Sequence, residues 1–422
     1  MKESKIPFHS SRLQIVHRKM SNLKYDVAFA PVNKRLILLS NDLSKALLKK
    51  GISSTILKTS LIGKDHNGWG DLDDELIQEK DITFMPEINY SHHSNFFTYS
   101  FRVIRSRLLM RKSYKPNYKC LILFMDDYAE SEVLIPLMKN QKIPVVLFQD
   151  GFFVKEKKYD FDLYSLGKFI RSRILPYFFT PLNYSENSDY IFSWSNYGFN
   201  DFLKKIKTDP LKIKIVGYPF KIVDKKLPIM NRYKKILILH SPLPSLKAEE
   251  ADNKNYLDIF KVLDEHNFDI YFKAHPRVGF KKITNLINEY NKTGVENKPV
   301  IIDRKISSEV LYNDYDVLIM TPSAAAIEAL YRGIPVIFLP NKHSRVELIE
   351  KLASQDKVIL IEDINFLPLI IDKLNTDLSY RNKVITLGYE AARIIGGDLD
   401  VFDNNFPIEV SNILNKFEHE IK

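Results

Sequence analysis

Four short polar clusters in this sequence each follow a short apolar run, and their residue types suit the binding of an anionic ligand. They are Asp150-Gly151, Ser241 to Ser245, Lys273 to Pro276 and Thr321 to Ser323. Short apolar runs bounded by turn residues predict the buried strands of a parallel sheet. Ligands of such sheets bind outside the carboxyl ends of the strands, so these clusters are candidate binding sites.

The fourth cluster is the most informative. Residues 317–320 predict a strand, Pro322 prevents its continuation, and the good helix formers after Ser323 predict a helix that ends at Gly333. We therefore expect Ser323 to be the N-cap residue. A hydroxyl, free backbone N–H groups and the positive end of a helix dipole at one turn suit a phosphate. The alternative is an ordinary capped helix packed on a sheet.

Two side chains in these clusters have the chemistry for group transfer. Asp150 can take the proton from an attacking hydroxyl, and His275 can hydrogen-bond to or protonate a departing phosphate. Each also has a structural alternative, because Asp-Gly is a common turn pair and a histidine before Pro276 can be held by hydrogen bonds in a loop. Glu328 lies more than a turn into the predicted helix, where it either reaches ribose hydroxyls or is solvated.

The same residues resemble the motifs of a known enzyme family. Gln149-Asp150-Gly151, His275-Pro276 and Ser323 follow the order of three short motifs in bacterial sialyltransferases and polysialyltransferases of the GT-B fold. Residues 148–153 also resemble a segment of capsule Kdo transferases. The resemblance implies that Asp150 is the general base, that His275 acts on the CMP phosphate of the donor, and that Ser323 binds this phosphate. Gln149 departs from the family pattern, which usually has a second acid there, and this leaves the donor sugar open.

The other candidate residues are assigned to the two substrates of such a transferase. The predicted contacts of the nucleotide donor are Ser241, Ser245, Lys273, Pro276, Thr321, Ser323, Ala324 and Glu328. The predicted contacts of the acceptor are Asn33, Gly151 and Phe152. No Asp-x-Asp pair follows a predicted strand, so we expect no metal and no cofactor, and a donor with a single phosphate suits this set.

The order of the predicted elements indicates an α/β chain of two similar halves. The chain of 422 residues is too long for one core, and the alternation of strands and helices restarts near residue 236. We expect a GT-B fold, with two Rossmann-like domains facing across a cleft and an interdomain crossover turn at 217–219. The first expected part is an acceptor-binding domain at residues 1–222, followed by a linker at 223–233. A nucleotide-sugar-binding domain is expected at 234–395, and a tail helix at 396–422 that packs back on the first domain.

Composition excludes several classes of protein. A hydrophobic content of 45% indicates a globular chain, and no apolar run reaches the ~20 residues that span a bilayer. The N-terminal residues lack the apolar stretch of a signal peptide, and the single Cys120 excludes an intrachain disulfide, so we expect a cytoplasmic protein. No zinc spacing, P-loop, dinucleotide fingerprint or RNA-binding signature occurs, and nucleic acid is not an expected partner of the enzyme.

A net charge of +10 indicates an anionic partner. The basic amphipathic stretches at 101–115 and 168–181 are either solvated surface helices or contacts with the inner face of an anionic membrane.

The predicted function is inverting, metal-independent transfer of a CMP-activated nonulosonate (sialic acid) or Kdo-like sugar to a bacterial surface glycan or glycolipid, such as lipooligosaccharide or capsule.

Two alternatives stay open. Residues 273–276 and 323–338 are also similar to the polymerases that transfer glycerol phosphate from CDP-glycerol in teichoic acid synthesis. The other alternative is a non-catalytic module that binds a polyanionic glycan or nucleic acid.

Overall fold

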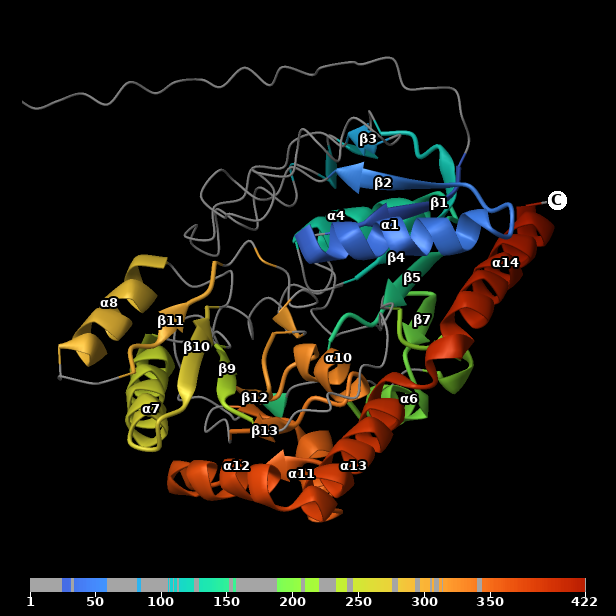
Figure 1. Cartoon of the computed structure of the whole chain (residues 1–422). Coiled ribbons are helices and arrows are strands. Elements are labelled where there is room, and N and C mark those ends of the chain that lie inside the picture. Colours follow the sequence, from blue (N-terminus) through green and yellow to red (C-terminus); the bar gives the residue numbers. More distant parts are fainter. Residues whose placement is uncertain are drawn as a thin grey trace, which may run out of the picture.

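The structure, a computed structural model, consists of two parallel α/β domains and a long C-terminal helix (Figure 1). It describes residues 25–31, 34–58, 82–84, 105, 107–108, 110–111, 114–124, 129–151, 155–156, 188–205, 209–219, 233–240, 246–274, 280–292, 297–303, 306, 311–312, 314–339 and 344–421. Most of the two basic stretches, and most of the predicted linker, lie outside these residues. Within the described part of the chain, every helix is too short or too polar to span a bilayer.

The first domain is built on a parallel sheet with the strand order β3-β2-β1-β4-β5-β7-β8. The strands are β1 (Tyr25–Ala30), β2 (Ser54–Lys58), β3 (Ile82–Phe84), β4 (Tyr118–Leu123), β5 (Val145–Phe148), β7 (Tyr190–Ser193) and β8 (Ile213–Ile215). The helices between them are α1 (Lys34–Leu48), α4 (Ala129–Asn140) and α6 (Asn196–Lys205). All four residues of β5 are buried, because helices cover both faces of a parallel sheet.

The second domain is built on a parallel sheet with the order β11-β10-β9-β12-β13-β15. The strands are β9 (Lys235–Leu239), β10 (Asp269–Lys273), β11 (Val300–Ile301), β12 (Val317–Met320), β13 (Val336–Phe338) and β15 (Ile359–Leu360). The helices are α7 (Leu246–Asp264), α8 (Phe280–Asn291), α10 (Ala325–Tyr331), α11 (Glu347–Ser354), α12 (Leu367–Thr376) and α13 (Leu378–Gly396). In chain order this sheet has the strand sequence of a Rossmann fold, and it reverses direction between β9 and β12.

A short antiparallel ladder joins the two domains. In it β6 (Lys155–Glu156) pairs with β14 (Ser344–Arg345), with Arg345 opposite Lys155. Because β6 follows the carboxyl end of β5 and β14 follows that of β13, the carboxyl ends of the two sheets face the same space. Helix α11 begins at Glu347, because the ladder takes Ser344 and Arg345 before it.

The C-terminal helix α14 (Phe402–Ile421) leaves the second domain and packs against α1 and β4 of the first (Figure 1). Its Phe402 and Phe406 rings contact the Phe148 ring, with centroids 6.4 Å and 5.9 Å away. One hydrophobic cluster therefore runs through the interior of both domains. The crossing helix buries its apolar face in the first domain, and this limits how far the two halves can separate.

The contacts of Asp26 on β1 predict that its carboxylate stabilises the fold at neutral pH and loses this effect in acid. Its carboxylate accepts hydrogen bonds from the Ser53 backbone N–H and hydroxyl at 2.9 and 2.7 Å, and it lies 3.1 Å from the Lys119 ammonium. Burial raises the pKa of Asp26, but the bonds from Ser53 and Lys119 outweigh it and hold this pKa below its usual value. A carboxyl with a depressed pKa stabilises the fold above its unfolded-state pKa of about 4, and this stabilisation is lost as pH falls through the folded-state pKa.

We therefore expect the difference in unfolding free energy between the wild type and Asp26→Asn to shrink as pH falls below about 4. Urea unfolding of both proteins at a series of pH values measures it. A difference that stays constant with pH would contradict this role of Asp26.

Candidate functional site

The Thr321–Ser323 turn lies at the point where the second sheet reverses its strand order, directly after β12. The Thr321 side chain is only 5% exposed, and its hydroxyl has no hydrogen-bond partner among the described residues. A buried hydroxyl without a partner is costly, so an oxygen of a ligand is a suitable partner for it. Ser323 is partly exposed at the same turn.

The predicted N-cap residue Ser323 lies one residue before the position at which the structure begins the cap of the following helix. Helix α10 begins at Ala325, and Ala324 before it is the N-cap residue, already in helical conformation and without a side-chain capping bond. The Ser323 hydroxyl is 3.5 Å from the Ala325 N–H, at the limit of a hydrogen bond. Ala324 itself is buried.

Glu328 is buried at the junction between the domains. It is 6% exposed, so the solvated alternative is wrong, and one of its carboxylate oxygens accepts a hydrogen bond from the Tyr218 hydroxyl at 3.4 Å. Tyr218 follows β8 of the first domain, whereas Glu328 lies on α10 of the second. The contact therefore joins the first domain to the helix that follows the Thr321–Ser323 turn.

Lys273 at the end of β10 is buried, and its ammonium donates a hydrogen bond to the Ile306 carbonyl at 2.6 Å. Burial lowers the pKa of Lys273, and the nearby Asp303 carboxylate opposes this effect. Some of the predicted site residues lie outside the part of the chain that the structure describes. They are Asn33, Phe152, Ser241, Ser245, His275 and Pro276.

In the first domain, Asp150 and Gly151 follow β5 directly, and both are partly exposed. A chain of contacts links this turn to α10. The Gln149 side-chain oxygen accepts a hydrogen bond from the Trp194 backbone N–H at 3.0 Å, and the Trp194 ring packs edge-on against the Tyr218 ring with centroids 5.0 Å apart. Tyr218 in turn donates to Glu328. The structure thus brings the Asp150 turn and the helix after Ser323 to one junction.

Sequence reasoning missed Trp194 as part of this junction and treated Tyr218 only as part of a crossover turn. The sequence contains only two tryptophans, and one that directly follows a predicted strand of a ligand-binding sheet was an available signal. The glycine before Tyr218 was a second signal, because glycine is favoured where the backbone takes a positive φ, and the φ of Gly217 is +90° in the structure.

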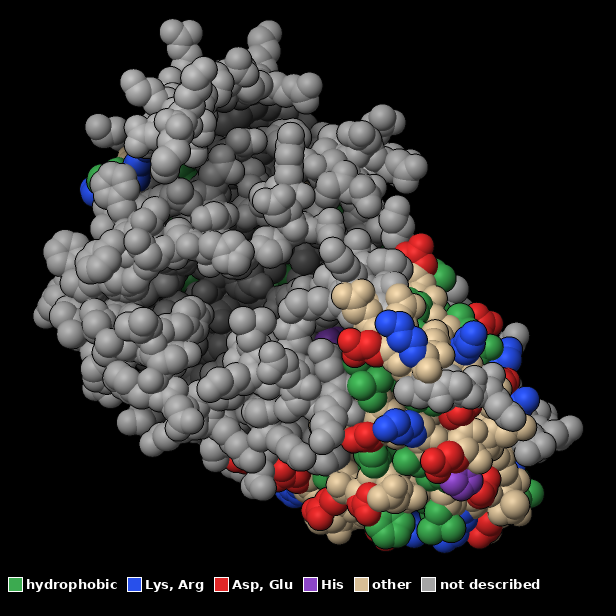
Figure 2. All heavy atoms as spheres, turned by 90° about the vertical axis from the view of Figure 1, so that its left-hand side faces the viewer, with side chains coloured by type: hydrophobic (Ala, Val, Ile, Leu, Met, Phe, Trp, Pro, Cys, Tyr) green, Lys and Arg blue, Asp and Glu red, His purple; other side chains and the backbone are tan. Residues whose placement is uncertain are grey.

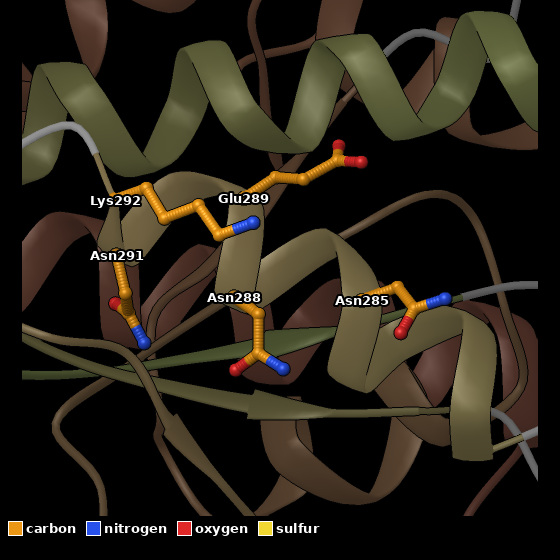
Figure 3. Close-up of a pocket in the computed structure, with 5 residues that line it drawn as sticks. All are labelled: Asn285, Asn288, Glu289, Asn291 and Lys292. Carbon is orange, nitrogen blue, oxygen red and sulfur yellow. The ribbon is translucent and has the colours of Figure 1, made fainter.

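A separate polar pocket runs along α8 and is lined by Asn285, Asn288, Glu289, Asn291 and Lys292 (Figure 3). These residues occupy the second half of the helix and the residue after it, and Lys292 lies roughly 18 Å along the axis from Phe280, where the helix begins. Since the carboxyl edge of the sheet is at the Phe280 end, we do not assign this pocket to the donor.

Among the described residues, no group of three His, Cys, Asp or Glu side chains is placed to hold a metal ion.

Two Rossmann-like domains with facing carboxyl edges, and a C-terminal helix that crosses back to the first domain, define the GT-B fold. The fold predicted from the sequence is confirmed by the solved structures that this chain resembles.

A glycosyltransferase from Rickettsia africae is 18% identical with a TM-score of 0.52, over 94% of this chain and 99% of that one. A putative UDP-N-acetylglucosamine 2-epimerase from Listeria monocytogenes is 13% identical with a TM-score of 0.59, over 94% and 97%. The UDP-GlcNAc 2-epimerase from Neisseria meningitidis, bound to UDP-GlcNAc, is 15% identical with a TM-score of 0.53, over 93% and 100%. At these identities the likeness shows the fold alone.

A family model described as alpha-2,8-polysialyltransferase (POLYST) matches residues 177–315. The match includes Lys273 and His275 but neither Asp150 nor Ser323. No curated protein matches the sequence. The fold and the family match together support a glycosyltransferase.

Proposed function

We propose that the protein is an inverting, metal-independent glycosyltransferase that moves an acidic sugar, of the sialic acid or Kdo type, from a CMP donor to a bacterial surface glycan or glycolipid. The observation that carries this proposal is the junction at which the Asp150 turn and the helix after Ser323 meet through Trp194, Tyr218 and Glu328. A carboxylate and a phosphate-binding turn on opposite sides of an interdomain space suit direct transfer between two substrates. The polysialyltransferase match supports the choice of an acidic sugar.

In this mechanism the second domain holds the nucleotide. The hydroxyls of Thr321 and Ser323 donate to the donor phosphate, and the Lys273 ammonium adds positive charge at the neighbouring strand end. Ser241, Ser245, Pro276, Ala324 and Glu328 complete the proposed donor site. Asn33, Gly151 and Phe152 are the proposed contacts of the acceptor.

Asp150 supplies the chemistry from the other side. Its carboxylate removes the proton from an acceptor hydroxyl, and that oxygen forms the new bond to the anomeric carbon as the bond from this carbon to the phosphate oxygen breaks. CMP leaves with the bonding electron pair, and His275 donates a hydrogen bond or a proton to its phosphate. Attack from the face opposite CMP inverts the configuration of the anomeric carbon.

The surface of the second domain over α7 and α8 does not favour the alternative of a polyanion-binding module. Lys and Arg side chains alternate there with Asp and Glu side chains (Figure 2). Exposed Lys261 on α7, for example, is followed by exposed Glu265 just after that helix, and exposed Glu289 on α8 by exposed Lys292 just after that helix. A polyanion-binding surface needs a patch of one sign of charge.

We also propose that the enzyme acts in the cytoplasm, with its basic stretches at 101–115 and 168–181 toward an anionic membrane.

A thermal-shift panel of CMP, CDP, UDP and GDP tests the nature of the donor. We expect CMP to raise the melting temperature most, because it is the nucleotide of the proposed donor. A ligand at 100 times its Kd stabilises the fold by about 2.7 kcal/mol, and a shift of this size is readily measured. CDP separates the proposal from a glycerophosphotransferase, whose donor carries that nucleotide. A larger shift with UDP or GDP than with CMP would contradict a CMP-linked donor.

A further inference from the structure

Gln149 uses both ends of its side-chain amide, although it is 7% exposed. Its oxygen accepts hydrogen bonds from the Trp194 backbone N–H at 3.0 Å and from the Ser193 hydroxyl at 3.1 Å. Its nitrogen donates to the Gly151 carbonyl at 3.1 Å. Gln149 therefore connects the turn that carries Asp150 to the residues that follow β7.

The orientation of this amide is fixed by its backbone partners. A backbone N–H only donates, so the atom that faces Trp194 must be the amide oxygen. A backbone carbonyl only accepts, so the atom that faces Gly151 must be the amide nitrogen. A carboxylate at position 149 would keep the first bond but would face the Gly151 carbonyl with no proton to donate. An amide is the side chain that meets both demands at neutral pH.

Residues 193–195 are themselves fixed to the second domain. The Ser195 hydroxyl donates to the Ile395 carbonyl on α13 at 2.8 Å, and the Trp194 ring packs on Tyr218. A side chain on Gly397 would lie 2.8 Å from the Trp194 carbonyl, so the chain after α13 passes directly over this segment. An element bound to 193–195 is therefore positioned relative to the second domain as well as the first.

We propose that Gln149 is a positioning residue that holds the Asp150–Gly151 turn at the distance from the second domain that transfer requires. This inference rests on the role of Asp150 as the base in the proposed function. It also gives a reason for the amide at a position where the resembling families usually carry an acid.

Three variants test the proposal on the full chain. Gln149→Met keeps the length of the side chain and removes both sets of bonds. Gln149→Glu keeps the acceptor and loses the donor until it is protonated. Gly198→Ala leaves the residues of the turn unaltered and disturbs its contacts from α6. Its new methyl group would lie 2.7 Å from the Gln149 side-chain oxygen and 2.4 Å from the Ser193 hydroxyl.

Hydrogen–deuterium exchange of the peptide 149–156, corrected for the intrinsic exchange rate at each pH, reports the turn without reference to activity. We expect faster exchange in Gln149→Met at all pH values and in Gln149→Glu at pH 8, but not in Gln149→Glu near pH 6. Burial and the facing Gly151 carbonyl raise the pKa of a glutamate at 149, whereas the bonds from Trp194 and Ser193 oppose this effect, and the protonated form regains the donor. The described groups that contact this side chain from β5, β7 and α6 are Gly151, Ser193, Trp194 and Gly198, none of which titrates between pH 6 and pH 8.

Release of CMP from CMP-N-acetylneuraminate in the presence of an oligosialic acid acceptor reports turnover. We expect Gln149→Met and Gly198→Ala to lower kcat by about 10- to 100-fold with the donor KM within about twofold, since a small misplacement of a reacting group has this effect. Gln149→Glu should recover relative to Gln149→Met as pH falls from 8 to 6.

Unchanged exchange and wild-type kcat in Gln149→Met would overturn the proposal, and so would a Gln149→Glu variant with the wild-type pH profile. Faster exchange in Gln149→Met, together with a wild type that releases no CMP, would instead support the positioning of the turn and refute the transferase function.

Discussion

Asp150→Asn is expected to lower kcat by about 10²- to 10⁴-fold, which is the usual contribution of a general base. Asparagine has the same shape as aspartate but cannot take the proton from an acceptor hydroxyl. Nucleotide affinity should stay unchanged, because the proposed donor contacts are all on the second domain. Steady-state turnover of CMP-N-acetylneuraminate and calorimetric titration with CMP give the two quantities separately.

Asp209→Asn is the matched control for this variant. Asp209 also lies in the first domain, where its exposed carboxylate caps the short 3-10 turn Pro210–Lys212 by accepting from the Leu211 N–H at 2.9 Å. Asparagine caps equally well, so the control removes one negative charge without loss of the cap. If Asp150→Asn kept the turnover of Asp209→Asn, Asp150 would not be the base. A non-catalytic binding protein would show no difference between the two variants in any assay.

Gly217→Ala is expected to cause the largest loss of stability, of about 2–4 kcal/mol. Gly217 has a φ of +90°, which strains any residue with a side chain, and a methyl group there would lie 2.9 Å from the Phe402 backbone nitrogen at the start of α14. Backbone cannot move aside as a flexible side chain does. The strain and the clash therefore add, and the crossing helix would have to shift from the first domain.

Gly51→Ala separates the two contributions. Gly51 also has a positive φ, of +74°, but a methyl group there would meet nothing within 4 Å. Its loss should be only about 1–2 kcal/mol from the backbone conformation. Urea unfolding of the two variants under the same conditions makes the comparison. Equal losses would mean that the approach of α14 to Gly217 contributes nothing.

The unit from β12 to β13 could be predicted almost to the residue. The apolar run, Pro322 and Gly333 act locally, and each fixes the backbone through its own chemistry. The start of α10 differs from the prediction by one residue. The helix begins at Ala325, and the Ser323 hydroxyl accepts only a long bond from the Ala325 N–H, at 3.5 Å.

Contacts between distant segments account for what sequence reasoning could not settle. Whether Glu328 is solvated depends on Tyr218, which lies on the other domain. The β6–β14 ladder is too short to leave a periodic pattern, and its partners come from different halves of the chain. Gln149 looked like the loss of an acid in a motif, and only the positions of Trp194 and Gly151 show why an amide fits there.

The most direct test of the account is to locate bound CMP in a crystal structure of the protein. The account predicts the nucleotide at the carboxyl ends of β9 and β12, with its phosphate on the Thr321–Ser323 turn and facing Asp150 across the space between the domains. CMP bound on the sheet of the first domain, or on the second domain with its phosphate turned away from Asp150, would contradict it.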